Sequence, residues 1–224
     1  MLPLSAEKRD THLSVQNSKA LKGLALMLLL VHHLFWISNG LYDDITVAHH
    51  GVINELGKSC KLCVAIFVFL SGYGLTRQAK QKGGNHSLAA FYRHRLLKLL
   101  INYWFIWLLF VPIGVFVFGR TFEDSYHEWC VLKGIIDFVG LAFFVGFFGY
   151  NATWWFMSCI IILYLLYPIL YKMTKSHRDL TIIGSVAIML LPVPLIQYEI
   201  IRYVPPFILG IRLAIQGLPQ NGGG

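Results

Sequence analysis

A lysine and a histidine stand eleven residues apart in an apolar stretch near the start of the chain. Lys22 opens this stretch, His33 lies near its end, and His32 directly precedes His33. In a helix of 3.6 residues per turn, eleven residues make three turns plus roughly 20°, so Lys22 and His33 share one face while His32 points elsewhere. At about 1.5 Å rise per residue, Lys22 and His33 stand roughly 16 Å apart along the helix axis.

These two residue types could perform complementary chemistry. The imidazole of a histidine titrates near neutral pH, so His33 could remove a proton from an attacking hydroxyl. The ammonium of Lys22 could bind an anion, although a lysine at this position can also mark the membrane edge by snorkelling. A histidine can equally form an interhelical hydrogen bond. An ionisable group inside a membrane is nevertheless a functional candidate by default.

The composition places both residues in a membrane. Hydrophobic residues make up 56% of the 224 residues and charged residues only 13%. Several apolar runs approach twenty residues, which is more than a soluble domain of this length can bury. The net charge of +8 is concentrated in short polar segments between these runs, a pattern of membrane topology rather than of nucleic-acid binding. We therefore predict an integral membrane protein without a nucleic-acid partner.

The apolar runs predict an all-α, polytopic transmembrane helical bundle. They show no strand-like alternation, and only helices or closed barrels satisfy the backbone in hydrocarbon. We expect one transmembrane domain over residues 20–216, a cytoplasmic N-terminal segment 1–19 and a polar, glycine-rich tail 217–224. The six predicted spans are 21–37, 60–75, 96–118, 154–171, 180–196 and 203–215.

Basic residues orient this predicted bundle. The N-terminal segment is basic, and residues 76–95 contain five Lys or Arg residues, so both are expected on the cytoplasmic side. A weaker candidate span, 131–150, contains Lys133 and Asp137. If it crossed completely, the basic loop around Lys175 would lie outside, against the positive-inside tendency. A re-entrant or interfacial segment removes the conflict, so we predict six spans plus one such segment.

Five motifs in order resemble the acyltransferase-3 family of membrane proteins. The first is a basic residue, ten residues and a histidine, here Lys22, GLALMLLLVH and His33. The others are CVAIFVFLSGYGL, FYRHRLLKLLINYW, WWFMSCIIILYLLYPIL and VPPFILGI. This chain departs from the family in having lysine where arginine is commoner, which keeps the charge but loses the bidentate fork. It also has fewer spans than family members usually do, so we expect it to be C-terminally incomplete.

The resemblance implies an O-acyltransferase of a bacterial cell membrane. Such an enzyme moves an acyl group, often acetyl from acetyl-CoA, to a hydroxyl of a sugar or other cell-envelope acceptor. His33 would be the general base. Lys22, Arg93 and Arg95 would bind the phosphates of acyl-CoA at the cytoplasmic edge, although the two arginines also fit the positive-inside pattern alone. Acyl-CoA is expected as a substrate, and no permanently bound cofactor is expected.

Three residues are candidates for lining the cofactor or acceptor site. Ser71 and Tyr73 lie in FLSGYGL, which we interpret chiefly as a packing segment because no base is visible beside Ser71 to activate it as a nucleophile. Trp155 begins a span, where tryptophan either joins the interfacial aromatic belt or stacks on an acceptor sugar. Cys60 and Cys63 form one Cys-x-x-Cys pair without a second pair, so no metal site is expected.

Two other functions stay open at this level. A transporter or channel component could use Lys22, His33 and the prolines to line a proton or solute path. Transporters often contain internal repeats, and none is visible between the halves of this chain. A truncated, inactive relative of the acyltransferases is the other alternative. Dependence on CoA would separate an enzyme from a transporter, because a transporter has no reason to bind the thioester donor.

Overall fold

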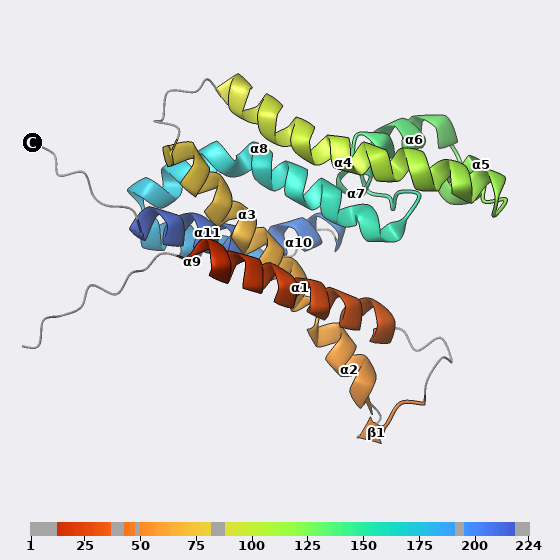
Figure 1. Ribbon diagram of the computed structural model, residues 1–224, viewed down its shortest axis with the longest axis horizontal. Coiled ribbons are helices and arrows are strands. Elements are labelled where there is room, and N and C mark those ends of the chain that lie inside the picture. Colours follow the sequence, from red (N-terminus) through yellow and green to blue (C-terminus); the bar gives the residue numbers. More distant parts are fainter. Residues whose placement is uncertain (1–12, 37–42, 48–49, 82–87, 191–194, 218–224) are drawn as a thin grey trace, which may run out of the picture. The chain divides into compact units, whose positions relative to one another are not determined.

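The computed structural model describes residues 13–36, 43–47, 50–81, 88–190 and 195–217, and helices dominate these residues (Figure 1). The chain divides into two compact units. The first, called here the N-terminal unit, runs to Gln78 and resumes at Pro206, and the second, the central unit, is Ala79–Pro205. The two units are described separately below.

Four helical stretches of the described chain are long and apolar enough to cross a membrane, which confirms the prediction of an all-α membrane protein. The fifth and sixth predicted spans fall on α9 (Arg178–Met189), α10 (Leu195–Arg202) and α11 (Val204–Gln216). These helices contain 12, 8 and 13 residues, fewer than the roughly 20 that cross a bilayer core. The six-span arrangement is therefore not confirmed. The four stretches are Val15–Phe35, Val52–Ala79, Tyr92–Phe116 and Ala152–Ser176.

The N-terminal unit begins with α1 (Val15–Phe35), where the Ser14 side chain accepts a hydrogen bond from the backbone N–H of Asn17 and so caps the helix. A short antiparallel pair, β1 (Thr46–Val47) and β2 (His50–Gly51), leads into α2 (Val52–Ser59). The long helix α3 (Leu62–Gln81) follows. The last helix of the described chain, α11, completes this unit.

Two glycines allow α3 and α11 to approach each other closely. A Cβ atom on Gly72 would collide with the carbonyl oxygen of Phe207, and one on Gly210 would collide with the carbonyl oxygen of Phe69. Phe207 itself is fully buried. Close backbone approach at small residues is the usual way in which helices associate in a membrane, where no hydrophobic force drives them together.

The central unit is built on α4 (Leu88–Phe116) and α8 (Trp155–Ser176), which contact each other (Figure 1). The hydroxyl of Tyr92 on α4 donates to the carbonyl oxygen of Leu165 on α8 at 2.8 Å. Between them the chain forms α5 (Phe122–Tyr126), α6 (Cys130–Phe138), α7 (Ala142–Val145) and a 3₁₀ turn (Ala152–Trp154).

The segment 131–150 packs back along α4. Its helices α6 and α7 have only 9 and 4 residues, so neither can cross a bilayer alone. Asp137, at the end of α6, accepts a hydrogen bond from Tyr103, which lies near the middle of the apolar stretch of α4. The chain then returns to the end of α4, where the Tyr150 ring packs against Gly114. The segment thus enters and leaves beside the same end of α4.

Candidate functional site

Lys22 and His33 both lie on the exposed side of α1. Neither side chain has a hydrogen-bond or ionic partner within the described residues, and His33 contacts the His32 ring at a centroid distance of 5.2 Å. The buried residues of α1 are Ala25 and His32, whose spacing of seven positions places them on one face, rotated away from the face of Lys22 and His33. Both side chains are therefore exposed within the described part of the chain.

His32, in contrast to His33, is buried and bonded within the protein. Its side chain is only 6% exposed, and its Nδ1 lies 2.8 Å from the carbonyl oxygen of Gly57 on α2. Because a carbonyl only accepts, Nδ1 carries the proton and donates it. The ring also stacks on Trp36 with a centroid distance of 5.1 Å and an interplanar angle of 15°. His32 therefore attaches the end of α1 to α2, one residue away from the candidate base.

Gly57 makes this attachment sterically feasible. A Cβ atom there would lie 2.7 Å from the carbonyl carbon of Phe35 and 2.8 Å from the backbone nitrogen of Trp36. Both distances are far below van der Waals contact, so a side chain at position 57 would push α1 away from α2. The end of α1 that carries His33 is thus held at backbone-to-backbone distance from its neighbour.

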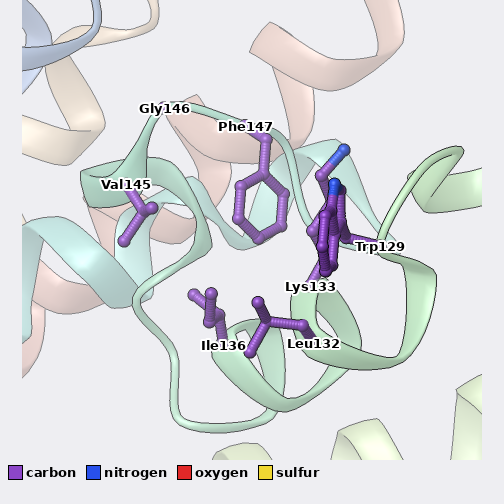
Figure 2. A pocket seen from close by; sticks show the side chains of 7 residues that line it. All are labelled: Trp129, Leu132, Lys133, Ile136, Val145, Gly146 and Phe147. Carbon is purple, nitrogen blue, oxygen red and sulfur yellow. The ribbon is translucent and has the colours of Figure 1, made fainter.

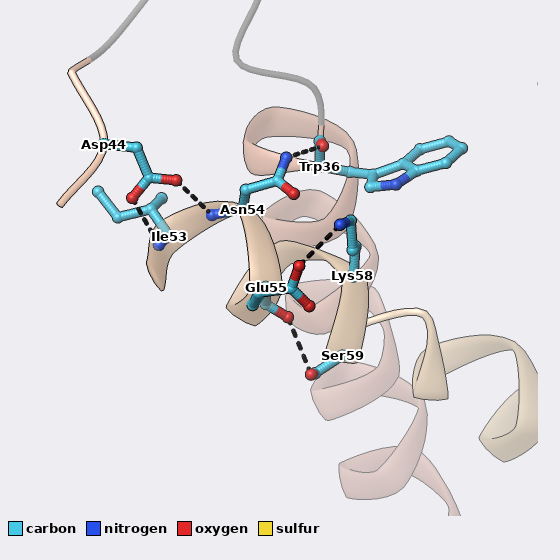
Figure 3. A network of polar contacts seen from close by, with 7 residues as sticks. All are labelled: Trp36, Asp44, Ile53, Asn54, Glu55, Lys58 and Ser59. Atoms are coloured by element: carbon cyan, nitrogen blue, oxygen red, sulfur yellow. Dashed lines mark hydrogen bonds and ion pairs between the residues drawn. The ribbon is translucent and has the colours of Figure 1, made fainter. Parts of the chain in front are cut away.

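A network of polar contacts joins the same end of α1 to the start of α2 (Figure 3). The carboxylate of Asp44 accepts hydrogen bonds from the backbone N–H groups of Ile53 and Asn54 at 2.8 and 2.9 Å. These are two of the N–H groups that the first turn of a helix leaves unpaired. The Asn54 side chain in turn donates to the carbonyl oxygen of Trp36. No sequence pattern indicated this role, because Asp44 lies eight residues before α2 begins.

Arg93 and Arg95 lie on α4 in the central unit, near the start of its apolar stretch. Arg93 is exposed and Arg95 half-buried, and neither has an ionic partner within the described residues. Neither guanidinium is therefore neutralised by a carboxylate of the described chain. Their role in binding CoA phosphates stays a prediction.

Ser71 and Tyr73 both use their hydroxyl groups inside the N-terminal unit. The Ser71 hydroxyl donates to the carbonyl oxygen of Phe67, one turn earlier on α3, at 2.9 Å. Tyr73 is buried, and its hydroxyl donates to the carbonyl oxygen of Leu13 at 3.2 Å and accepts from the Leu13 N–H at 3.1 Å. These contacts fit the packing interpretation of this segment, while lining of a cofactor site stays a prediction.

Trp155 belongs to an aromatic cluster of the central unit. Its ring stacks on Tyr203 with a centroid distance of 5.8 Å and an interplanar angle of 29°, and it lies 5.8 Å from the Phe143 ring. The side chain is half-buried. Part of the ring therefore stays open, and stacking on an acceptor sugar stays a prediction.

Asp137 is a buried carboxylate whose environment the sequence did not indicate. It is 1% exposed. Its Oδ2 accepts from the Tyr126 hydroxyl at 2.6 Å and from the Tyr150 N–H at 2.8 Å, while Oδ1 accepts from the Tyr103 hydroxyl at 3.0 Å. The indole N–H of Trp107 approaches Oδ2 at 3.4 Å. These neutral donors satisfy the buried oxygens.

The cysteines and other potential metal ligands form no cluster in the described part of the chain. All four cysteines, including Cys60 and Cys63, are free thiols. No three His, Cys, Asp or Glu side chains of the described residues are placed so that they could hold a metal ion.

Comparison with known proteins places most of the chain within one family model. The acyltransferase-3 model, described as an acyltransferase domain, matches residues 16–216. This stretch includes Lys22, His33, Arg93 and Arg95. Searches among curated proteins and among solved structures found no match.

Proposed function

The chain belongs to the acyltransferase-3 family. We therefore propose that it transfers an acyl group from acyl-CoA to a hydroxyl of a sugar or other cell-envelope acceptor, and we propose acetyl as this group. The family match supports acyl transfer over the transporter alternative. The observation that carries the proposal within the chain is the open face of α1, where Lys22 and His33 lie three turns apart and both stay exposed.

In this proposal His33 is the general base. Its neutral imidazole takes the proton of the acceptor hydroxyl while the hydroxyl oxygen attacks the thioester carbonyl carbon. The new C–O bond forms, the C–S bond breaks, and the departing CoA sulfur receives the proton from the imidazolium. His33 suits this role because its ring is exposed while His32 holds the helix beneath it.

Lys22, Arg93 and Arg95 would hold the phosphates of the donor. All three are basic and have no ionic partner among the described residues. Arginine can bind a phosphate through two parallel N–H groups, whereas lysine acts as a compact point charge. We therefore expect the arginines to fix the orientation of the phosphates and Lys22 to add electrostatic attraction.

The proposed topology places both ends of the chain in the cytoplasm of a bacterial cell, with six spans and a re-entrant segment at 131–150. Two observations support it. The basic segments around Arg93 and Lys175 then both lie inside, as the positive-inside tendency requires. The path of α6 and α7 along α4, with Asp137 bonded to Tyr103 and Tyr150 back beside Gly114, also fits a re-entrant hairpin.

The test follows labelled acetyl from acetyl-CoA into membrane acceptors in inverted vesicles, which expose the cytoplasmic side. We expect His33→Gln to lower the initial rate at least about 100-fold, the usual contribution of a general base. The matched control is His177→Gln, because His177 is an exposed histidine at the start of α9 in the central unit. His32→Ala is unsuitable as a control, since His32 is buried and bonded to Gly57.

Two outcomes would count against the proposal. Equal rates in the unaltered protein and in His33→Gln would remove His33 from the chemistry while leaving acyl transfer in place. No transfer from any acyl-CoA by the unaltered protein, in vesicles where it is present and folded, would remove the acyltransferase activity itself.

A further inference from the structure

A groove in the central unit is lined by none of the residues that the proposed reaction uses. It is formed by Trp129 and one face of α6 together with the end of α7 and the chain that follows it, and its volume is about 520 Å³ (Figure 2). Pockets that hold small ligands have volumes of about 300–1,000 Å³. The groove is lined by Trp129, Leu132, Lys133 and Ile136 on one side and by Val145 and Phe147 on the other.

The lining is apolar except for one cation. Among the described residues that line the groove, Lys133 is the only charged one, and none is acidic. A sugar would need several hydrogen-bonding groups in such a site, because each buried hydroxyl must be paired. An amphiphile with one anionic group and an apolar chain needs only one cation and an apolar surface for the chain. The lining therefore favours a lipid over a carbohydrate.

Lys133 keeps donors available for such a ligand. Its ammonium donates to the carbonyl oxygen of Tyr126 at 2.8 Å and lies 5.8 Å from the centre of the Phe147 ring. An ammonium has three N–H donors, and only one is used by this carbonyl. The position of the charge is thus fixed by the protein while a phosphate oxygen can still bind to it.

Trp129 is held at the groove in an unfavourable backbone conformation. Its φ of 59° lies in the left-handed region, which side-chain-bearing residues rarely adopt because of steric repulsion. The side chain is nevertheless 75% exposed, so no burial of the ring explains the strain. Exposed tryptophans of membrane proteins typically lie at the headgroup level of the bilayer.

The groove also has the direction that a lipid requires. Trp129 and Lys133 lie at the start of α6, and Ile136 lies near its end, beside Asp137. Asp137 is bonded to Tyr103, near the middle of the apolar stretch of α4. In the proposed topology, the groove therefore runs from its charged, aromatic end toward the depth at which acyl chains lie.

We propose that this groove binds one membrane phospholipid with an anionic headgroup. The phosphate accepts a hydrogen bond from the Lys133 ammonium, and the headgroup lies beside Trp129. One acyl chain follows Leu132, Ile136 and Val145. This binding site does not depend on the acyl-transfer proposal, because it includes none of the residues assigned to that reaction.

Bromine on a lipid chain quenches tryptophan on contact, which gives a direct test. The full chain is placed in phosphatidylcholine nanodiscs with a small fraction of either brominated phosphatidylglycerol or brominated phosphatidylcholine. The signal of Trp129 is the difference between the unaltered protein and Trp129→Phe. We expect brominated phosphatidylglycerol to quench Trp129 at roughly fivefold lower mole fraction, as one lysine near an anionic headgroup predicts.

Four variants make the result specific. Lys133→Gln should abolish the preference for phosphatidylglycerol, Lys133→Arg should keep it, and Lys172→Gln, an exposed lysine of α8, should leave it unchanged. Val145→Phe fills the groove while leaving Lys133 in place, so it should reduce quenching by both lipids. Equal quenching by both lipids in the unaltered protein would overturn the proposal. Absence of quenching by either lipid would also overturn it, because no lipid chain would then contact Trp129.

Discussion

At the scale of single residues, the two adjacent histidines of α1 have different environments. His32 is buried, donates to Gly57 and stacks on Trp36, whereas His33 is exposed. We expect His32→Ala to lower the free energy of unfolding by about 1–3 kcal/mol, because it leaves the Gly57 carbonyl unpaired. His33→Gln should leave this free energy within about 0.5 kcal/mol, as is usual for an exposed substitution.

Thermal unfolding of the purified protein in detergent, followed by intrinsic fluorescence, measures both effects. The two variants should therefore separate stability from activity, with His32→Ala affecting Tm and His33→Gln affecting the rate of acyl transfer. Equal losses of Tm would show that His33 also supports the fold.

The titration of the Tyr126 hydroxyl gives a second prediction at the scale of single residues. Burial, followed by the hydrogen bond to Asp137, raises its pKa above the ordinary value of a tyrosine. The stability that the protonated phenol contributes is therefore fully present below the unfolded pKa of about 10 and is lost as the pH rises through the higher folded value. In protein labelled with carbon-13 at the tyrosine Cζ, the resonance absent from Tyr126→Phe should stay unshifted between about pH 9 and 11. A midpoint near the ordinary tyrosine value would contradict this expectation.

At the scale of elements, Asp137 holds the segment 131–150 against α4. An asparagine there would present an N–H group to the donors of Tyr126, Tyr150 or Tyr103, and one buried donor would lose its acceptor. We expect Asp137→Asn to cost about 2–3 kcal/mol of unfolding free energy, in the range of hydrogen bonds to a charged group. Labelling of the nearby native Cys130 by maleimide should become faster.

The matched control for Asp137→Asn is Asp179→Asn. Asp179 is exposed beside Arg178 at the start of α9, and exposed ion pairs contribute little to stability. Unchanged Tm and unchanged Cys130 labelling in Asp137→Asn would show that the segment is held by its aromatic packing rather than by the carboxylate.

The contact between α3 and α11 offers a matched pair of glycines on one helix. Gly72→Ala should destabilise the protein, because its Cβ would collide with the Phe207 carbonyl oxygen. A Cβ on Gly74, two residues later, would meet no atom within 4 Å. Gly74→Ala should therefore be neutral or stabilising by up to about 1 kcal/mol, through helix propensity. A lower Tm for Gly74→Ala than for Gly72→Ala would contradict this packing.

The extent to which the site was predictable depends on the sequence distance between partners. The shared face of Lys22 and His33, and the different direction of His32, follow from helical periodicity within one segment. The bonds from Tyr103 to Asp137 and from Asp44 to α2 cross loops, and their geometry is set by tertiary packing. Periodicity contains no information on such contacts. The residues next to Tyr103 and Asp137 in the sequence do not indicate that these two side chains form a hydrogen bond.

The span count was less predictable for a related reason. An apolar run defines which residues avoid water, but helix length depends on where the backbone turns. In the predicted span 180–196, α9 ends at Met189 and α10 begins at Leu195. In 131–150, Gly140 and Gly146 adopt positive φ and turn the chain between and after two short helices. Hydropathy alone does not detect such turns.

At the scale of the whole molecule, the proposed topology predicts the side on which Lys175 lies. We expect Lys175→Cys, in a background where the native cysteines are replaced by serine or alanine, to react with a membrane-impermeant maleimide only after permeabilisation of the cells. The control is a cysteine in place of Asp124 between α4 and α6, which should react in intact cells because the proposal places it outside. Labelling of position 175 from outside would mean that 131–150 crosses the membrane completely.

The carboxylate of Asp137 also has a consequence for biogenesis. Tyr103, Trp107 and Tyr126 all precede it in the chain, so these three donors have already been synthesised when Asp137 leaves the ribosome. Only the Tyr150 N–H follows, thirteen residues later. Since synthesis and folding proceed from the N-terminus, the proposed topology lets this charge enter the bilayer after α4. In that topology, the order of the elements along the chain supplies the carboxylate with three donors before it reaches hydrocarbon.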